Sequence, residues 1–359
     1  MSDSFLLSRA LLQFDSDLDD LIGEISAIAF TPDGSLWLGS DELLTIERLS
    51  PISPGIYGQH KQFQLKDFIE LFDNKSEIDI EGMAYADGYL WFVGSHSTKR
   101  NKPKGNEYNK DIDALSEIET ELNRYLLARV PVVNGQLVKS YKRSDCNQET
   151  LTAAALRKTS QHNQLIEALL EDRHLGPIIK ARIPSKDNGL DIEGLAVCGK
   201  RIFLGLRGPV LRGRAVILEI EVEDEEPGIL GLKAIGDNNE RYRKHFVNLN
   251  GLGVRELCLR EGHLLILAGP TMDLTGAMQV FQLKNLLDHS NNTIWEQSSG
   301  DLSVLFDLPF VPGADKAEGI ALIPCLGYDT ALMVAHDSPS DNRRPSKKSI
   351  LADIFRLPD

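Results

Sequence analysis

A short motif that recurs along the chain constrains its fold more than any other feature. The tetrapeptide Asp-Ile-Glu-Gly begins at Asp79 and again at Asp191, and a third copy, Lys-Ala-Glu-Gly, begins at Lys316. Each copy is followed by a short turn and a hydrophobic run that closes on Gly or Ala. A repeated strand-turn-strand unit means that one supersecondary element is used several times. The repeat also puts the same carboxylate at the same place in several units.

Two weaker copies extend the series. Ser26 takes the place of the Glu in a unit that ends at Gly39, and Arg255 takes it in a unit that ends at Gly269. Five units then begin near positions 25, 80, 192, 254 and 317. Most are roughly 55–65 residues apart, which is longer than the blades of the commonest propellers. The gap between the second and third units is nearly double.

A third and often a fourth hydrophobic run follow each pair of strands, bounded by turn residues. Five such four-stranded units are typical of a β-propeller. The sequence therefore predicts an all-β fold, a five-bladed propeller, with six blades as the alternative if the long gap hides one more. Because exposed strand edges are a liability, we expect the N-terminal segment SFLLSRALLQF to close the ring as the strand that the last unit lacks. The third runs lie at 43–49, 124–133, 215–223, 277–283 and 350–357, and the fourth at 61–65, 136–142, 229–235 and 295–308.

The long gap carries helical spacing instead of a further unit. Apolar residues recur at i, i+3 and i+4 over 109–123 and again over 149–173, which is the pattern of an amphipathic helix. We therefore expect one propeller domain over 1–359. Helical or loop insertions at 99–123 and 143–178 would flank the outer hairpin of the second blade.

Charge and composition exclude some classes of partner. Lys+Arg number 39 and Asp+Glu 53, and the net charge of −14 has the wrong sign for binding nucleic acid phosphates. No run of about 18 apolar residues is present and the first residues do not resemble a signal peptide, so we expect no membrane association. The four cysteines, Cys146, Cys198, Cys258 and Cys325, are widely spaced and form no CxxC pair. We expect free thiols in a cytoplasmic protein.

The repeated position should form a ring at one end of the central channel, because the innermost strand of each blade lines that channel. Its members would be Ser26, Glu81, Glu193, Arg255 and Glu318. Three carboxylates on a narrow axis raise one another's pKa, and a bound cation would relieve this. Oxygen ligands favour Ca²⁺ or Mg²⁺, so one hypothesis is a metal site at Glu81, Glu193, Glu318 and Ser26. Because Arg255 could neutralise a Glu and repel a metal, a structural clasp between blades and a metal-free acid–base role are the alternatives.

Two histidines occupy equivalent loops after the second strand of their units. His96 follows the strand ending at Gly94, and His336 follows Ala335 and precedes Asp337. A histidine in such a place could act as a general acid or base near neutral pH. His96, His336 and Asp337 are therefore the candidate catalytic residues, although a histidine in a loop is more often only hydrogen bonded.

Basic residues gather at the same expected mouth. Arg207 matches His96 in position and is followed by Arg212 in the segment GLRGPVLRG, and arginine forks suit carboxylate or phosphate groups. Lys99 and Arg100 begin a basic run just after His96. Together with Arg255 these are the candidate ligand-binding residues. The alternatives are ion pairing with the ring carboxylates and a solvated loop.

Several blocks together resemble one uncharacterised bacterial family, the domain of unknown function 3616. They are SHSTKR at 95–100, RYLLARVP at 124–131, AAALR at 153–157, IPSKDNGLDIEGLAV at 183–197, LGLRGPVLRGRAVILEI at 204–220 and LLILAGPT at 264–271. The resemblance spans nearly the whole chain and implies one propeller-like domain with a helical insert. A looser similarity, on the repeated Glu-Gly alone, is to phytase-like esterase and calcium-dependent nucleotidase propellers. It implies calcium ligands at Ser26, Glu81, Glu193 and Glu318, a pattern from which Arg255 departs.

The leading hypothesis is a cytoplasmic propeller that binds a small anionic ligand, with phosphorylated molecules among the candidates, at one mouth of the channel. Metal-assisted hydrolysis of a phosphoester is the reaction that this site would suit. The alternative is a non-catalytic scaffold with a protein partner, because a fold does not fix a function.

Overall fold

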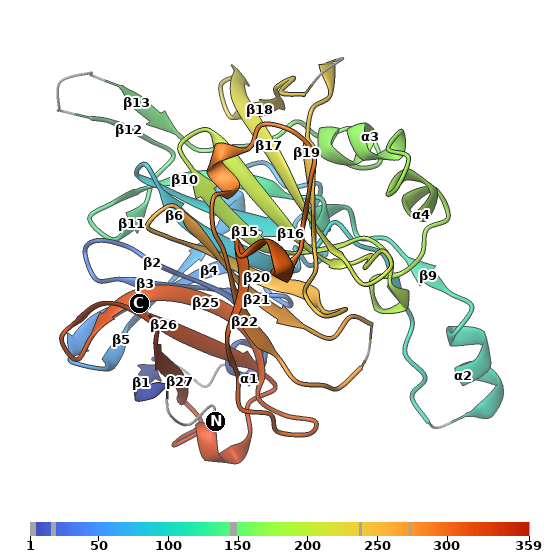
Figure 1. Cartoon of the computed structure of the whole chain (residues 1–359). Coiled ribbons are helices and arrows are strands. Elements are labelled where there is room, and N and C mark those ends of the chain that lie inside the picture. The colour runs from blue at the N-terminus through green and yellow to red at the C-terminus, as the bar shows by residue number, and fades with distance from the viewer. Residues whose placement is uncertain are drawn as a thin grey trace.

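A computed structural model describes residues 5–15, 19–105, 107–143, 149–236, 239–272 and 274–358. Strands make up 51% of the structure and helices 12%, so the fold is mostly β, as predicted. The strands form curled, propeller-like sheets (Figure 1). Cys198, Cys258 and Cys325 are free thiols, and Cys146 lies outside the described residues. Within those residues, no helix is long and apolar enough to cross a membrane.

The two ends of the chain meet in one eight-stranded sheet. Its first half contains the antiparallel strands β2 (Ile25–Phe30), β3 (Leu36–Ser40), β4 (Thr45–Ser53) and β5 (Ile56–Gln64). Its second half contains β25 (Lys316–Cys325), β26 (Tyr328–Asp337), β27 (Ser349–Arg356) and β1 (Leu6–Gln13). The N-terminal strand β1 pairs antiparallel with β27 and, over two residues, parallel with β5.

The middle of the chain forms a second large sheet. It contains β6 (Ile80–Ala86), β7 (Tyr89–Gly94), β10 (Leu127–Val133), β14 (Ala154–Leu156), β15 (Asp191–Cys198), β16 (Arg201–Gly208), β17 (Ala215–Glu226) and β18 (Ile229–Leu232), with β11 (Gln136–Leu137), β19 (Arg243–Val247) and β23 (Thr293–Trp295) at its sides. A separate antiparallel sheet follows, with β20 (Gly253–Arg260), β21 (His263–Gly269), β22 (Gln279–Leu283) and β24 (Leu302–Asp307). All five predicted third runs fall on strands, namely β4, β10, β17, β22 and β27.

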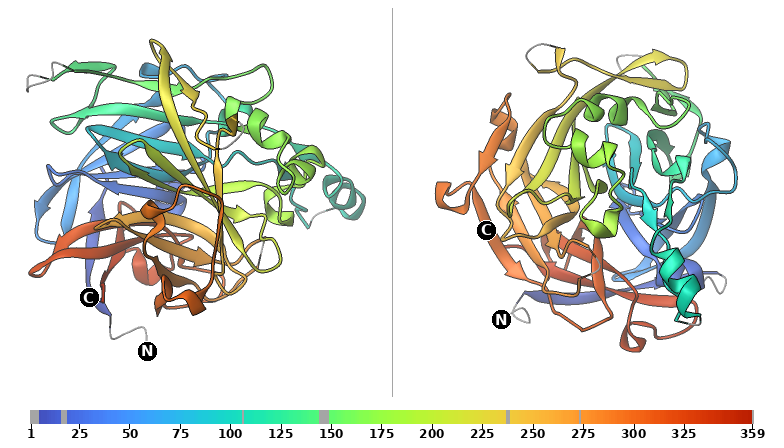
Figure 2. Two further views of the ribbon diagram at one scale, coloured as in Figure 1. Left: turned by 45° about the horizontal axis from the view of Figure 1, so that its top comes forward. Right: turned by 90° about the vertical axis from the view of Figure 1, so that its right-hand side faces the viewer.

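The five strands that carry the repeated motif lie side by side around a common axis (Figure 2). In chain order these are β2, β6, β15, β20 and β25, and β25 contacts β2. Three consecutive residues from each strand line an apolar axial cavity of about 200 Å³. The sheets around this axis pack against one another through apolar clusters. In one cluster, Phe203 and Phe281 are buried between the sheet that contains β15 and the sheet that contains β20.

The glycine of the motif stands where neighbouring motif strands approach most closely. A Cβ atom added at Gly82 would lie 2.8 Å from Leu195 Cβ, and one at Gly194 would lie 2.7 Å from Leu257 Cγ. A Cβ at Gly319 would lie 3.0 Å from the backbone nitrogen of Ile28. The Glu-Gly pair is therefore explained by crowding at three separate strand contacts.

The helical prediction for the long gap is correct only in part. Helix α2 (Tyr108–Ala114) lies within 109–123 apart from its first residue, followed by β9 (Ile118–Glu119), which pairs with β8 (Lys99–Arg100). The prediction of a helix over 149–173 is wrong at its start. Residues there form β13 (Thr150–Thr152), paired with β12 (Ser140–Lys142), and then β14, which pairs with β10 and β18. β14 lies inside the second large sheet, between β10 and β18, and that tertiary pairing overrides the helical spacing of the segment.

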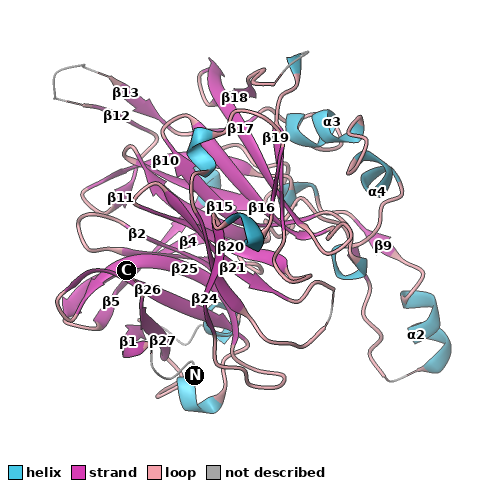
Figure 3. Cartoon of the chain, in the orientation of Figure 1, coloured by secondary structure: helices cyan, strands magenta, loops and turns pink. Residues whose placement is uncertain are grey.

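The helices that do form in this region lie together at one side of the molecule (Figure 3). They are α3 (Gln164–Leu170) and α4 (Gly176–Lys180). The short α1 (Asp19–Gly23) belongs to the same apolar cluster as the N-terminal strand. Asn163 caps α3, because its side-chain oxygen accepts hydrogen bonds from the backbone nitrogens of Leu165 and Ile166, each at 3.1 Å. Leu165, Ile166 and Leu169 are buried against the second large sheet.

Candidate ligand site at the channel mouth

The repeated position is a bulge in every motif strand. In β6, Ile80 pairs with Gly94 and Gly82 pairs with Val93, so Glu81 is an extra residue without a partner. The same register shift isolates Ser26, Glu193 and Arg255 in their strands, and in β25 a register shift spans Glu318 together with Gly319. A β-bulge re-aims the side chain of the extra residue and is frequent beside functional sites. One irregularity, repeated in each unit, thus produces the ring that the sequence predicts.

Ion pairs hold most of this ring. Arg255 Nε lies 2.9 Å from Glu193 Oε2, and the Arg255 guanidinium also pairs with Glu318. Arg207 Nη1 donates to Glu193 Oε1 at 2.8 Å. The Ser26 hydroxyl donates to the carbonyl oxygen of Ile80. The mutual neutralisation of arginines and glutamates matches the clasp alternative for these residues.

Glu81 differs from the other ring members. Among the described residues it has no hydrogen bond or ion pair, although its side chain is only partly accessible to solvent. Burial, followed by the nearby carboxylates of Glu193, Asp79 and Asp191, raises the pKa of Glu81 well above its usual range. Glu81 therefore takes up a proton more readily than an ordinary glutamate.

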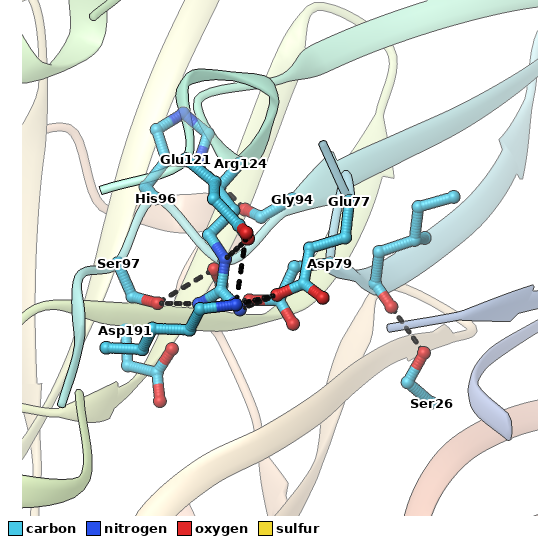
Figure 4. A network of polar contacts seen from close by, with 12 residues as sticks. Ser26, Glu77, Asp79, Gly94, His96, Ser97, Glu121, Arg124 and Asp191 are labelled. Carbon is cyan, nitrogen blue, oxygen red and sulfur yellow. Dashed lines mark hydrogen bonds and ion pairs between the residues drawn. The ribbon is translucent and has the colours of Figure 1, made fainter. Parts of the chain in front are cut away.

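A second arginine organises the acidic side of the mouth (Figure 4). Arg124 Nη1 lies 3.0 Å from Asp79 Oδ2 and donates to Ser97 Oγ at 3.0 Å, and its guanidinium also pairs with Glu77 and Glu121. Burial raises the pKa of Asp79 although Arg124 opposes the shift. Sequence reasoning missed Arg124 because it lies far along the chain from the motif, at the end of a short 3₁₀ turn.

A cavity of about 150 Å³ opens beside the ring. Its charged side contains Arg207, Arg255 and Glu318, and its apolar side comes from the loops at 270–278 and 309–315. Arg207 Nη2 donates to the carbonyl oxygen of Met272 at 2.6 Å and so ties one of these loops to the ring. The other lining residues include Asp41, Lys186, Lys316, Asp337, Leu274, Phe310 and Val311.

Asp41 is a lining residue of this cavity whose pKa is strongly raised. Burial raises its pKa to about 8, and the carboxylates of Asp79, Glu24 and Asp337 add to the shift. Its Oδ1 atom is buried and has no hydrogen-bond partner among the described residues. A carboxyl group with such a pKa can both give and take a proton at physiological pH. Asp41 follows the second strand of the first unit, in the loop equivalent to that of His96.

His96 lies in a different environment from the one that acid–base chemistry requires. It is buried, its Nδ1 bonds the carbonyl oxygen of Gly94 at 2.8 Å, and its Nε2 accepts from Asn163 Nδ2 at 2.8 Å. Burial lowers its pKa to about 4. Both ring nitrogens are thus occupied within the protein.

His336 is also buried, and burial, assisted by the positive charge of Arg343, lowers its pKa to about 4. Its Nε2 lies 3.9 Å from Asp353 Oδ2, and its Nδ1 has no hydrogen-bond partner among the described residues. Asp337 does line the mouth cavity, where one of its oxygens lies 3.1 Å from Lys316 Nζ.

The remaining predicted ligand residues lie away from the cavity. Arg212 is exposed in the loop before β17. Lys99 Nζ pairs with Glu77 at 3.0 Å and with Glu121 at 3.1 Å, and Arg100 pairs with Asp187 at 2.7 Å. Of the five predicted anion ligands, the structure brings Arg207 and Arg255 together at the cavity.

The predicted metal ligands do not form a metal-binding arrangement. Across the described ranges, no three His, Cys, Asp or Glu side chains are placed to hold one ion. Arg255 gives the physical reason, because its guanidinium occupies the space between Glu193 and Glu318 where a cation would have to lie. The residues present therefore do not fit an axial metal while Arg255 keeps these contacts.

Glu256 is a further functional residue that sequence reasoning missed. It occupies the position that is glycine in the units of Glu81, Glu193 and Glu318. Its Oε1 accepts hydrogen bonds from the backbone nitrogens of Leu195 and Leu257, each at 2.8 Å. Burial raises its pKa well above the usual range. Glu256 therefore accepts hydrogen bonds from backbone groups, one of them on a neighbouring motif strand. The clasp hypothesis assigned this kind of role to the ring glutamates.

Fold and site together define a propeller-like β protein with a charged site at one end of its axis. The family model described as "Protein of unknown function (DUF3616)" matches residues 24–353, and the chain belongs to this family. No curated protein matches the chain.

Solved structures resemble the chain only distantly. One is virginiamycin B lyase from Staphylococcus aureus, with 12% identity and a TM-score of 0.33 over 92% of this chain and 67% of the other. Another is the aldose sugar dehydrogenase of Streptomyces coelicolor, with 10% identity and a TM-score of 0.37 over 97% and 98%. Likeness at this level does not bear on what the present chain binds.

Proposed function

We propose that the protein binds a small organic anion in the cavity at the channel mouth. The observation that carries this proposal is Arg255, a guanidinium that is 7% exposed and lines the cavity. Its Nη2 atom donates to Glu318 and its Nε atom faces Glu193, which leaves Nη1 as the nitrogen that an anionic group could contact. Lys186, which is exposed at the rim and has no ion pair within the described ranges, adds a second positive charge.

The rest of the cavity suits the apolar body of such a ligand. Leu274, Phe310 and Val311 line it, and their exposed fractions are 61%, 48% and 39%. A ligand in contact with them would remove apolar surface from water, at about 25 cal/mol per Å². We therefore favour an anion with a hydrophobic portion, such as an aryl phosphate or an aromatic carboxylate, over an inorganic ion.

We further propose that hydrolysis of such a ligand, where it occurs, uses Asp41 as the general acid or base. Asp41 replaces His96 and His336 in this role, because it lines the cavity and its pKa is about 8. Hydrolysis assisted by a metal at Glu81, Glu193 and Glu318 would require Arg255 to withdraw, so the proposed reaction is metal-free.

Calorimetric titration with 4-nitrophenyl phosphate, phenylacetate and inorganic phosphate tests the binding proposal. We expect the two aryl anions to bind more tightly than phosphate, and Lys186→Gln to weaken them about threefold to tenfold. Lys200→Gln, at an exposed lysine outside the lining of this cavity, is the matched control. Equal affinities in wild type and Lys186→Gln, or binding of none of the three, would contradict the proposal. The catalytic proposal would be established if the wild type releases nitrophenolate from 4-nitrophenyl phosphate and Asp41→Asn does not.

The alternative function is a non-catalytic scaffold for a protein partner. The exposed apolar side chains of Leu274 and Phe310 favour it, since a partner could cover them as well as a ligand could. The two functions separate in one experiment. Leu274→Ser with Phe310→Ser should abolish partner capture in the scaffold case, whereas Arg255→Gln should spare it.

We also propose that the fold is a single five-bladed propeller over 1–359, with its ring closed by β1 and with insertions at 99–123 and 143–178. Support comes from the five bulged motif strands and from the pairing of β1 with β27. A cytoplasmic location is proposed as well, and the free thiols of Cys198, Cys258 and Cys325 agree with a reducing compartment.

A further inference from the structure

A second and larger cavity lies away from the mouth and is lined in part by the helices α3 and α4, which Figure 1 shows side by side. Its volume is about 530 Å³, within the range of small-molecule sites. Its walls come from the two helices, from the segment around Leu122 and Tyr125, and from the residues that lead into β15. None of its lining residues also lines the mouth cavity.

One side of this cavity is apolar. Six aliphatic side chains line it from four separate segments: Leu122, Ile166, Leu170, Ile179, Ile183 and Leu190. Beside them stand three aromatic rings in edge-to-face contact. The His96 and Tyr125 ring centroids are 5.9 Å apart, and those of Tyr125 and His162 are 6.3 Å apart. Such a surface suits a flat hydrophobic group.

The charge of the cavity has one sign. In a chain with a net charge of −14, no acidic residue of the described ranges lines this cavity, whereas Lys180 and Arg182 do. Lys180 pairs with Glu171 at 3.0 Å, outside the cavity, while Arg182 donates from Nη2 to Thr120 Oγ1 at 3.0 Å and has no ion pair with a described residue. The guanidinium of Arg182 is therefore the uncompensated charge at the rim.

A polar group inside the cavity also lacks a partner. The Oγ1 atom of Thr98 is buried and makes no hydrogen bond to a described residue. Buried hydroxyl groups are normally hydrogen bonded, so this one is an exception in the wall of the cavity. This observation is independent of the charge at the rim.

We propose that this cavity is a second binding site, which takes a small monocarboxylic acid with an aromatic body. The aromatic body lies between the aliphatic wall and Tyr125, and the carboxylate accepts hydrogen bonds from Arg182 at the rim. The site is separate from the mouth and does not depend on the function proposed there.

Calorimetry and isoleucine methyl NMR with three matched probes test this proposal. The probes are 4-phenylbutyrate, 4-phenylbutan-1-ol and 4-phenylbutylamine, which share the apolar body and differ in the charged group. We expect the acid to bind about tenfold more tightly than the alcohol, and the amine to bind weakest. The methyl signals of Ile166, Ile179 and Ile183 should shift with the acid.

Two variants locate the site. Arg182→Gln should weaken the acid about tenfold without weakening the alcohol, and Gln161→Trp, at an exposed position of the lining, should block both. Lys186→Gln, at the mouth cavity, should leave the shifts of the three isoleucine methyl signals unchanged. The proposal is overturned if the amine binds as tightly as the acid, if the three isoleucine methyl signals do not shift, or if Lys186→Gln weakens binding while Arg182→Gln does not.

Discussion

Replacing Arg255 by Gln tests whether ion pairs hold the ring at the channel mouth. Arg255 pairs with Glu193 and Glu318, and the three side chains are 8%, 2% and 13% exposed. Burial lowers the pKa of Arg255, so the charged form depends on these carboxylates. Removal of one partner from a buried ion pair leaves an uncompensated charge, at a cost of about 3–5 kcal/mol.

The geometry places the expected cost near the lower end of that range. Glu193 keeps Arg207 at 2.8 Å, so the charge left without a partner is mainly that of Glu318, which is the more exposed of the two. We therefore expect Arg255→Gln to lower the free energy of unfolding by about 3 kcal/mol at pH 7. The double variant Arg255→Gln/Glu318→Gln should recover at least half of the loss, because it removes the stranded charge as well.

Equilibrium urea unfolding measures both variants, with Arg9→Gln as the control. Arg9 pairs with Asp353 at 2.8 Å but is 48% exposed, so its loss should cost less than about 1 kcal/mol. The difference in unfolding free energy between wild type and Arg255→Gln should also shrink as the pH falls from 7 toward 4. Without the guanidinium, the pKa of Glu318 in the folded state rises above the unfolded value of about 4.3. A carboxyl group with a raised folded-state pKa lowers the free energy of unfolding increasingly as pH rises. A loss below about 1 kcal/mol, or a double variant no more stable than the single one, would refute this reasoning.

Three further predictions concern the mouth and the N-terminal strand. Asp41→Asn should gain stability relative to wild type as pH rises from about 5 to 8. A carboxyl group whose folded-state pKa is raised to about 8 destabilises the fold increasingly over that range. The prediction fails if the unfolding free energies of the two proteins do not diverge with pH. The melting temperature of the wild type should be the same in Ca²⁺, Mg²⁺ or Mn²⁺ as in EDTA. The same ions should raise the melting temperature of Arg255→Gln, because the ring carboxylates of that variant lack the guanidinium. A rise in the wild type would restore the axial-metal hypothesis. Deletion of residues 1–13 should cost at least about 4 kcal/mol, because Ala10 and Leu12 are buried and β1 pairs along β27, and a peptide of that sequence added in excess should restore the loss.

Sequence periodicity predicted the framework of this protein because each unit repeats its own local signals. The motif strands and the third strands fall where turn residues and hydrophobic runs indicate, and the ring residues Ser26, Glu81, Glu193, Arg255 and Glu318 do occupy equivalent places. The bulge that produces this equivalence could not be predicted, since it depends on the register between two strands.

The parts that failed depend on contacts between distant segments. The segment at 150–156 has helical spacing, but it forms strands because β12 pairs with residues 150–152 and β10 and β18 pair with residues 154–156. His96 has the right position for a catalytic loop, yet Asn163, 67 residues away, occupies its second nitrogen. Burial is the main cause of the raised pKa of Asp41, and Asp79 and Asp337 of other units add to it, which no local pattern records.

The pairing of β1 with β27 has a consequence for synthesis of the protein. Arg9 and Asp353, which face each other across these strands, are 344 residues apart in the sequence. At about 5–20 residues per second, the ribosome takes roughly 20–70 s to make the partner of a strand that emerged at the start. During that time β1 carries apolar residues with nothing antiparallel to bind, and β5 offers it only a short parallel contact. We therefore expect the nascent chain to need a chaperone at its N-terminal segment, and the final step of folding to be the capture of the first strand by the last.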